Sequence, residues 1–147
     1  GHFLVKVRLP DGYVVLDPLS GQSLAPEEIA ERLEPLRQHL LDATDEELPL
    51  ALYLQAASER DILARMLRNL KEIHRGNQDW PRLIAVQDRM LVLDPQAWSE
   101  WRDRGMAHVE AGDDDRAASD LQTYLDHMPQ AADAFEVQTL IRRLAGN

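Results

Sequence analysis

The chain contains no cysteine among its 147 residues, which excludes disulfide bonds, thiolate metal sites and a cysteine nucleophile within this chain. It also lacks any apolar run near the roughly 20 residues that a membrane-spanning helix needs. The stretch from Phe3 to Leu9 is interrupted by Lys6 and Arg8, which does not fit a signal peptide. These absences predict a cytoplasmic chain with no membrane partner.

Positive charge is also scarce, because 16 lysines and arginines stand against 26 aspartates and glutamates, a formal net charge of −10. Phosphate backbones repel a protein of this charge, so we expect no nucleic-acid partner. The carboxylates of residues 113–115 suit a helix N-terminus and lack the ligand spacing of a calcium loop. We expect no metal and no cofactor, because metal-ligand spacing is also missing from the helical histidines, which are His39, His74, His108 and His127.

A repeat of 34 residues is the most informative feature of what is present. Asp79 and Asp113 open two similar segments, which end at Pro95 and Pro129. A fixed period of this length indicates stacked helical pairs, since each pair buries its apolar face only against its neighbours. Caps and turn residues predict a helix between Ser58 and Gly76, then helices over residues 79–93, 96–111, 113–127 and 131–145.

The second of these segments resembles the tetratricopeptide repeat (TPR). Its small residues let two antiparallel helices approach closely, and its large residues fill the space between repeats. The matching positions are Trp101, Gly105, Ala107, Gly112, Ala117, Leu121 and Pro129. The first repeat is a weaker copy in which Lys71 stands at the glycine position. It matches at Leu67, Leu70, Trp80, Met90 and Pro95.

The resemblance implies a concave surface that binds a protein or peptide partner. The first helix of each pair lines that surface in such arrays, which here implies Arg65, Arg68, Glu72, Arg102, Met106 and Arg143. Arginines gathered on one surface of an acidic chain favour a carboxylate-rich or C-terminal peptide. Solvated helix faces with i,i+4 ion pairs are the alternative interpretation of the same residues.

Residues 2–17 alternate apolar and polar side chains, which predicts a β-hairpin with its turn at residues 10–12. If Leu9 pairs with Val14, one face carries Phe3, Val5, Val7, Leu9, Val14 and Leu16. A lone hairpin is marginal in water, so it needs more sheet, a helix or a further N-terminal piece, and its unpaired edge is a candidate for self-association.

A loop over 18–23 follows the hairpin. A helix then begins at Pro26, and Pro35 should break or kink it. An acidic connector over 42–49 comes next.

The segments Gly1-His2-Phe3-Leu4-Val5 and Leu16-Asp17-Pro18-Leu19-Ser20-Gly21 resemble the histidine and aspartate strands of transglutaminase-like, papain-type domains. Combined with C-terminal repeats, they resemble the bacterial SirB-like family, of which this chain looks like the C-terminal part. The resemblance implies that His2 is the general base and that Asp17 orients it, with the nucleophile in an upstream segment. On the residues alone, His2 also fits an exposed terminal residue and Asp17 a turn former.

The predicted fold class is therefore α+β and predominantly α. We expect the hairpin end of a transglutaminase-like domain in residues 1–24, connector helices in 25–57 and TPR-like repeats with a capping helix in 58–147. The expected function is the interaction module of a transglutaminase-like regulatory protein, which binds a partner peptide or its own N-terminal domain. The alternative is the C-terminal part of a cysteine-type acyl-transfer enzyme, a transglutaminase, protease or amidase, although this chain has no cysteine for that reaction.

Overall fold

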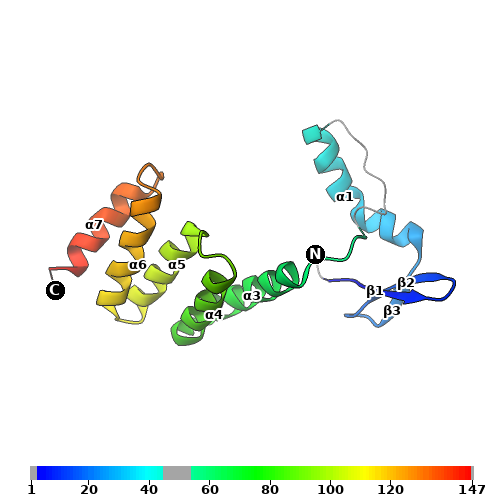
Figure 1. Cartoon of the computed structure of the whole chain (residues 1–147), viewed down its shortest axis with the longest axis horizontal. Coiled ribbons are helices and arrows are strands. Elements are labelled where there is room, and N and C mark those ends of the chain that lie inside the picture. Colours follow the sequence, from blue (N-terminus) through cyan, green and yellow to red (C-terminus); the bar gives the residue numbers. More distant parts are fainter. Residues whose placement is uncertain (1–2, 45–53, 147) are drawn as a thin grey trace. The chain divides into compact units, whose positions relative to one another are not determined.

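The computed structural model describes residues 3–44 and 54–146, and the chain divides into two compact units, residues 1–57 and 58–147. Among the described residues, the first unit holds a small antiparallel sheet and one helix, and the second holds five consecutive helices (Figure 1). This confirms the α+β, mainly α, fold class. None of the described helices is both long and apolar enough to cross a bilayer.

The sheet has the strand order β1-β2-β3, and the predicted hairpin register is wrong by two residues. Leu9 pairs with Gly12 rather than with Val14, because the turn between the strands has only two residues. Gly12, the first residue after this turn, adopts a φ of +152°. A shift of two residues keeps every side chain on its predicted face, since strand side chains alternate with a period of two. The strands are β1 (Val5–Leu9), β2 (Gly12–Asp17) and β3 (Gln22–Leu24).

The segment predicted as a loop over 18–23 instead leads into β3, which adds a third strand beside β2. Val15 of β2, Leu24 of β3 and Ile29 of helix α1 (Pro26–Thr44) form the buried core of this unit. The face that carries Val15 is therefore the covered one.

The sequence predicts a break or a kink at Pro35, and helix α1 continues through Pro35, so the break does not occur. The helix also includes the first residues of the predicted acidic connector. The rest of that connector lies outside the described residues.

Exposed apolar side chains remain on the other face of the sheet, where Val5, Val7 and Leu9 are each more than a third exposed.

The second unit follows the predicted helices closely, and consecutive helices pack on one another (Figure 1). The side chains of Ser58, Asp79 and Asp113 each accept a hydrogen bond from a backbone N–H three residues later, which fixes where three helices begin. The helices are α3 (Glu59–Gly76), α4 (Trp80–Leu93), α5 (Trp98–Glu110), α6 (Asp114–His127) and α7 (Ala134–Leu144).

The core of the second repeat explains its small residues. Leu121 of α6 is fully buried, and Trp101 of α5 packs against its cluster. A Cβ placed on Gly105 would lie 2.8 Å from Cγ of Leu121, so only glycine lets α5 and α6 approach this closely. This close contact between the two helices explains why the TPR pattern has a small residue at position 105 and a large one at position 121.

The first repeat has polar residues where the second has that glycine and leucine. Lys71 stands 34 residues before Gly105, and Gln87 stands 34 residues before Leu121. Both polar side chains are buried, Lys71 at 6% and Gln87 at 0% exposure. The two repeats therefore share a backbone arrangement but differ in the chemistry of their cores.

Candidate peptide-binding groove

A groove of about 500 Å³ lies between α3, the start of α4 and α5. Its apolar lining comes from two side chains of α4, Trp80 and Leu83, and two of α5, Met106 and Ala107. Charged and polar groups surround this apolar surface; they are Arg75, Gln78, Arg102, Asp103 and Glu110. An apolar surface with a polar rim is the arrangement that anchors a side chain of a partner and orients it.

A buried lysine connects two of the helices that form this groove. Nζ of Lys71 on α3 lies 2.6 Å from Oε2 of Glu100 and 2.8 Å from Oδ2 of Asp103, both on α5. Burial alone would raise the pKa of Asp103, but the hydrogen bonds from Lys71 and Arg102 outweigh it and hold that pKa below its usual value. The lysine that departs from the TPR pattern thus ties α3 to α5.

Arg102 is held tightly by carboxylates of its own chain. Its Nη2 lies 2.8 Å from Oδ1 of Asp103, and its Nη1 lies 2.8 Å from Oδ2 of Asp133. The hydrogen bond to Asp103 is the main reason that the pKa of Arg102 is raised above its usual value. Tyr124 donates a 2.6 Å hydrogen bond to Asp133, and this bond together with Arg102 lowers the pKa of Asp133.

Arg75 is the more loosely held of the two arginines in the groove. Its Nη2 lies 3.4 Å from Oδ2 of Asp103, and its Nη1 lies 3.6 Å from Oε1 of Glu72. Its side chain is 47% exposed, against 35% for Arg102. Because long, exposed ion pairs contribute little, Arg75 is the cation that can exchange its partners at least cost.

The structure brings two of the six sequence-predicted groove residues together, since Arg102 and Met106 both line the groove. Glu72 lies beside it and contacts Arg75. The other three, Arg65, Arg68 and Arg143, are outside the lining; Arg68 and Arg143 are exposed on α3 and α7, and Arg65 is half-buried on α3. These positions remain predictions of the sequence.

Arg75, Trp80 and Asp103 line the groove but were not predicted from the sequence. The TPR resemblance implies a groove lined by the first helix of each pair, whereas Trp80 belongs to the start of a second helix, α4. The seven-residue spacing between Arg68 and Arg75 was an available signal, since residues two helical turns apart share one side of a helix.

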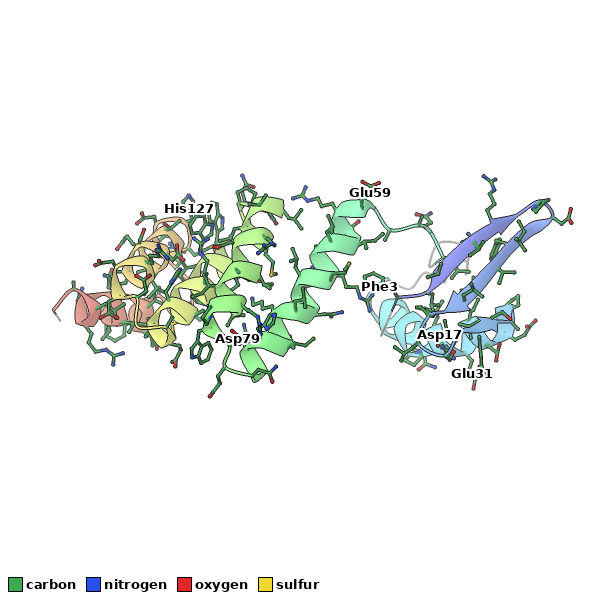
Figure 2. All side chains as sticks on the ribbon, turned by 90° about the horizontal axis from the view of Figure 1, so that it is seen from below. Phe3, Asp17, Glu31, Glu59, Asp79 and His127 are labelled. Atoms are coloured by element: carbon green, nitrogen blue, oxygen red, sulfur yellow. The ribbon has the colours of Figure 1, made fainter. Side chains whose placement is uncertain are left out.

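Asp17 occupies the end of β2 and is 4% exposed (Figure 2). Its Oδ1 accepts a hydrogen bond of 2.9 Å from the backbone N–H of Leu19, and its Oδ2 lies 3.0 Å from Nη1 of Arg32 on α1. The first contact fits the turn-forming role, and the second neutralises the buried carboxylate. His2, the predicted base, lies outside the described residues.

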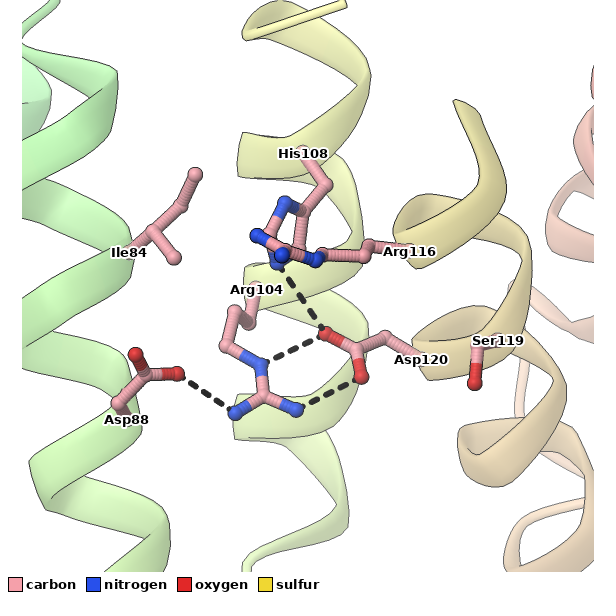
Figure 3. Close-up of a pocket in the computed structure, with 7 residues that line it drawn as sticks. All are labelled: Ile84, Asp88, Arg104, His108, Arg116, Ser119 and Asp120. Carbon is pink, nitrogen blue, oxygen red and sulfur yellow. Dashed lines mark hydrogen bonds and ion pairs between the residues drawn. The ribbon is translucent and has the colours of Figure 1, made fainter. Parts of the chain in front are cut away.

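A second hollow, of about 410 Å³, lies between α4, α5 and α6 and is strongly polar (Figure 3). Arg104 of α5 binds both carboxylate oxygens of the buried Asp120 on α6, each at 2.7 Å, and its Nη1 lies 2.7 Å from Asp88 on α4. Nε2 of His108 lies 4.0 Å from the same Asp120.

Because the Asp120 carboxylate is occupied by Arg104, this cluster joins three helices rather than activating a nucleophile. Ser119 lines the same hollow, and no described side chain connects it to His108 by a hydrogen bond. Within residues 3–44 and 54–146, no group of three or more histidine, aspartate or glutamate side chains is placed to hold a metal ion.

Comparison with known families gives two matches, one to the N-terminal half of the chain and one to the C-terminal half. Residues 1–68 match the transglutaminase-like superfamily, and residues 70–142 match the tetratricopeptide repeat. The chain therefore carries a transglutaminase-like region followed by TPR repeats.

Two curated relatives, each described as a UPF0162 protein, come from Xylella fastidiosa strains Temecula1 and 9a5c. Each is 38% identical to the chain over 130 residues, which is 88% of this chain and 45% of the relative. The chain thus spans less than half the length of these relatives. Their origin fits the predicted bacterial source.

Proposed function

We propose that this chain is the protein-interaction module of a SirB-like, transglutaminase-like regulatory protein of the bacterial cytoplasm. Its repeats bind a partner peptide in the groove between α3, α4 and α5 or, alternatively, the N-terminal domain of the same protein. The observation that carries the peptide proposal is an apolar lining next to a loosely paired arginine, Arg75.

The groove favours a peptide that combines an apolar side chain with a carboxylate. The apolar side chain would contact Trp80, Leu83 and Met106, which together provide the apolar surface. The carboxylate would meet Arg75, because Arg102 already has close contacts with Asp103 and Asp133. A nucleic-acid partner remains disfavoured by the net charge of −10.

Selection of short random peptides displayed on phage tests this proposal. The wild-type chain should enrich peptides with an acidic residue near an apolar one, and Arg75→Ala should weaken their binding about tenfold by removing a charge-assisted hydrogen bond. Arg82→Ala is the matched control, since Arg82 is also exposed and also makes an i,i+3 ion pair, but lies outside the groove lining. Thermal melting of each variant separates lost binding from lost folding.

Retention of the same peptides at the same affinity by Arg75→Ala would contradict the groove assignment. Charge reversal at Arg65 and Arg68 tests the wider surface that the sequence implied. If those changes abolish binding and Arg75→Ala does not, the peptide lies along α3 outside the groove.

The second candidate function is an acyl-transfer enzyme of the cysteine type, of which this chain would be the C-terminal part. The buried Asp17 and the transglutaminase-like match over residues 1–68 favour it. His2 would be the base, Asp17 would orient it, and the nucleophile would come from an upstream segment. The reading frame upstream of Gly1 tests this, because a cysteine at the head of a helix there keeps the enzyme and serine, alanine or glycine leaves the binding module.

We also propose self-association through the open side of the sheet. β1 is an edge strand among the described strands, and its Val5, Val7 and Leu9 are exposed. Light scattering of the purified chain tests this, since a monomer at all concentrations would contradict it.

A further inference from the structure

The first repeat helix, α3, carries an exposed apolar stripe that the groove does not use. Each of α4, α5 and α7 leaves one large hydrophobic side chain exposed, whereas α3 leaves five. These are Ile62, Leu63, Met66, Leu70 and Ile73, with exposures of 38%, 49%, 50%, 40% and 55%. Their spacing of three and four residues places them on one side of the helix, so they form a continuous stripe.

The stripe occupies repeat positions that serve as a stacking surface one repeat later. Adding the 34-residue period takes Met66 to Glu100 and Leu70 to Arg104 on α5. Glu100 contacts Lys71 of α3, and Arg104 contacts Asp88 of α4, so both positions pack on the preceding helical pair. The same positions on α3 are therefore built to stack on a preceding helical layer.

The outer end of a helical array is normally polar, because an apolar end is insoluble. α3 breaks this rule, whereas its opposite side carries Arg68, Glu72 and Arg75. An apolar stripe at this end indicates that another folded surface covers it.

The family matches indicate what that surface is. The transglutaminase-like match extends to residue 68, ten residues into α3, and the TPR match begins at residue 70. Ile62, Leu63 and Met66 thus lie within the segment that matches the transglutaminase-like superfamily. More than half of each Xylella relative lies outside the part that this chain matches, which leaves room for further helices of such a domain.

We infer that the apolar stripe of α3 docks on an apolar helix face from the remainder of a transglutaminase-like domain, in the longer protein. The stripe takes the place that a preceding repeat would fill, so the array is anchored on that domain by the same stacking that joins its own repeats. This surface is separate from the peptide groove, and the inference holds or fails independently of peptide binding.

Thiol protection tests the inference directly, since the chain has no cysteine and an introduced one is a unique probe within it. Met66→Cys and Ile73→Cys place the probe on the stripe. Val92→Cys is the matched control, because Val92 is an exposed hydrophobic residue of α4, at 80% exposure, outside the stripe. The rate of maleimide labelling at each site is measured in the 147-residue chain and in the polypeptide made from the complete reading frame, with labelled peptides located by mass spectrometry.

In the 147-residue chain, all three sites should react readily and independently of protein concentration. In the complete polypeptide, labelling at residues 66 and 73 should slow by at least about tenfold, because a covered thiol reacts only after local opening, while labelling at residue 92 should not change. Equal labelling of stripe and control sites in the complete polypeptide overturns the inference. Protection that already appears in the short chain and rises with concentration also overturns it, because a second copy is then the occupant.

Discussion

Replacement of Gln87 by leucine should stabilise the repeat unit, although it removes a polar side chain from a helix. Gln87 lies on α4 and is fully buried. Neither its Nε2 nor its Oε1 has a hydrogen-bond partner in the part of the chain that the structure describes. The equivalent residue of the second repeat is Leu121, which is buried to the same extent.

The magnitude follows from the amide that is left unpaired. A buried polar group without a partner costs about 1–3 kcal/mol, and leucine of similar size also gains from apolar burial. The gain is reduced because position 71 holds a lysine stem where the second repeat has Gly105, so the fit around leucine is less close. We therefore expect Gln87→Leu to raise the free energy of unfolding by about 2 kcal/mol, roughly 10 °C in melting temperature for a unit of this size.

Tryptophan fluorescence during urea unfolding is the appropriate assay. All three tryptophans, Trp80, Trp98 and Trp101, lie in the repeat unit, so their signal reports on that unit alone. Gln96→Leu is the control, because Gln96 is exposed and its replacement should change stability by less than about 0.5 kcal/mol. Gln87→Met tests for steric strain, since methionine adapts its shape. A loss of stability in both Gln87 variants would show that the amide has a partner in the folded protein and would contradict this prediction.

Four further outcomes are expected from the same unit. Gly105→Ala should lower stability by about 1–3 kcal/mol in urea unfolding despite its better helix propensity, because the added Cβ would lie 2.8 Å from a side-chain carbon of α6. Gln78→Gly should raise the free energy of unfolding by about 1 kcal/mol in urea unfolding, because Gln78 is a non-glycine residue at φ +54°. The pKa of Asp133 is lowered in the folded state, so the ionised Asp133 carboxylate stabilises the fold at every pH above its unfolded pKa. This stabilisation is lost as the pH falls through the folded pKa, so the free energy of unfolding should decline below about pH 4. Asp133→Asn should make that decline shallower. Arg104→Met should cost about 3 kcal/mol in thermal or urea unfolding, because it removes both Arg104 hydrogen bonds from the buried Asp120 carboxylate of α6.

The helices were predictable because their signals are local. A side-chain oxygen at Ser58, Asp79 or Asp113 caps a helix through contacts only three residues long, and the prolines that set the period are visible in any reading of the sequence. Period-two alternation likewise identified the faces of the hairpin. Its register was wrong because it depends on whether the turn has two or four residues, and an even error leaves the alternation unchanged.

Strand β3 and the groove were less predictable because they depend on contacts between distant residues. Three residues, Gln22–Leu24, form β3 only because β2 supplies the pairing. The sequence showed Lys71 as a departure from the TPR glycine, but nothing local shows that its ammonium group reaches Glu100 and Asp103 about thirty residues later. Charge pairing across helices therefore decided which predicted arginines are available.

The first repeat differs from the second at three positions where a polar side chain stands in place of glycine or leucine. Lys71, Gln78 and Gln87 of the first repeat stand at the positions that Gly105, Gly112 and Leu121 occupy in the second. Two of the replacements cost stability on general grounds, since one holds a side chain at positive φ and another buries an unpaired amide. Two of the three residues also belong to the surroundings of the groove, since Gln78 lines it and Lys71 binds Asp103, which lines it too. A residue that costs stability but belongs to such a surface is typical of a binding site, so the proposed peptide partner is best sought at the first repeat.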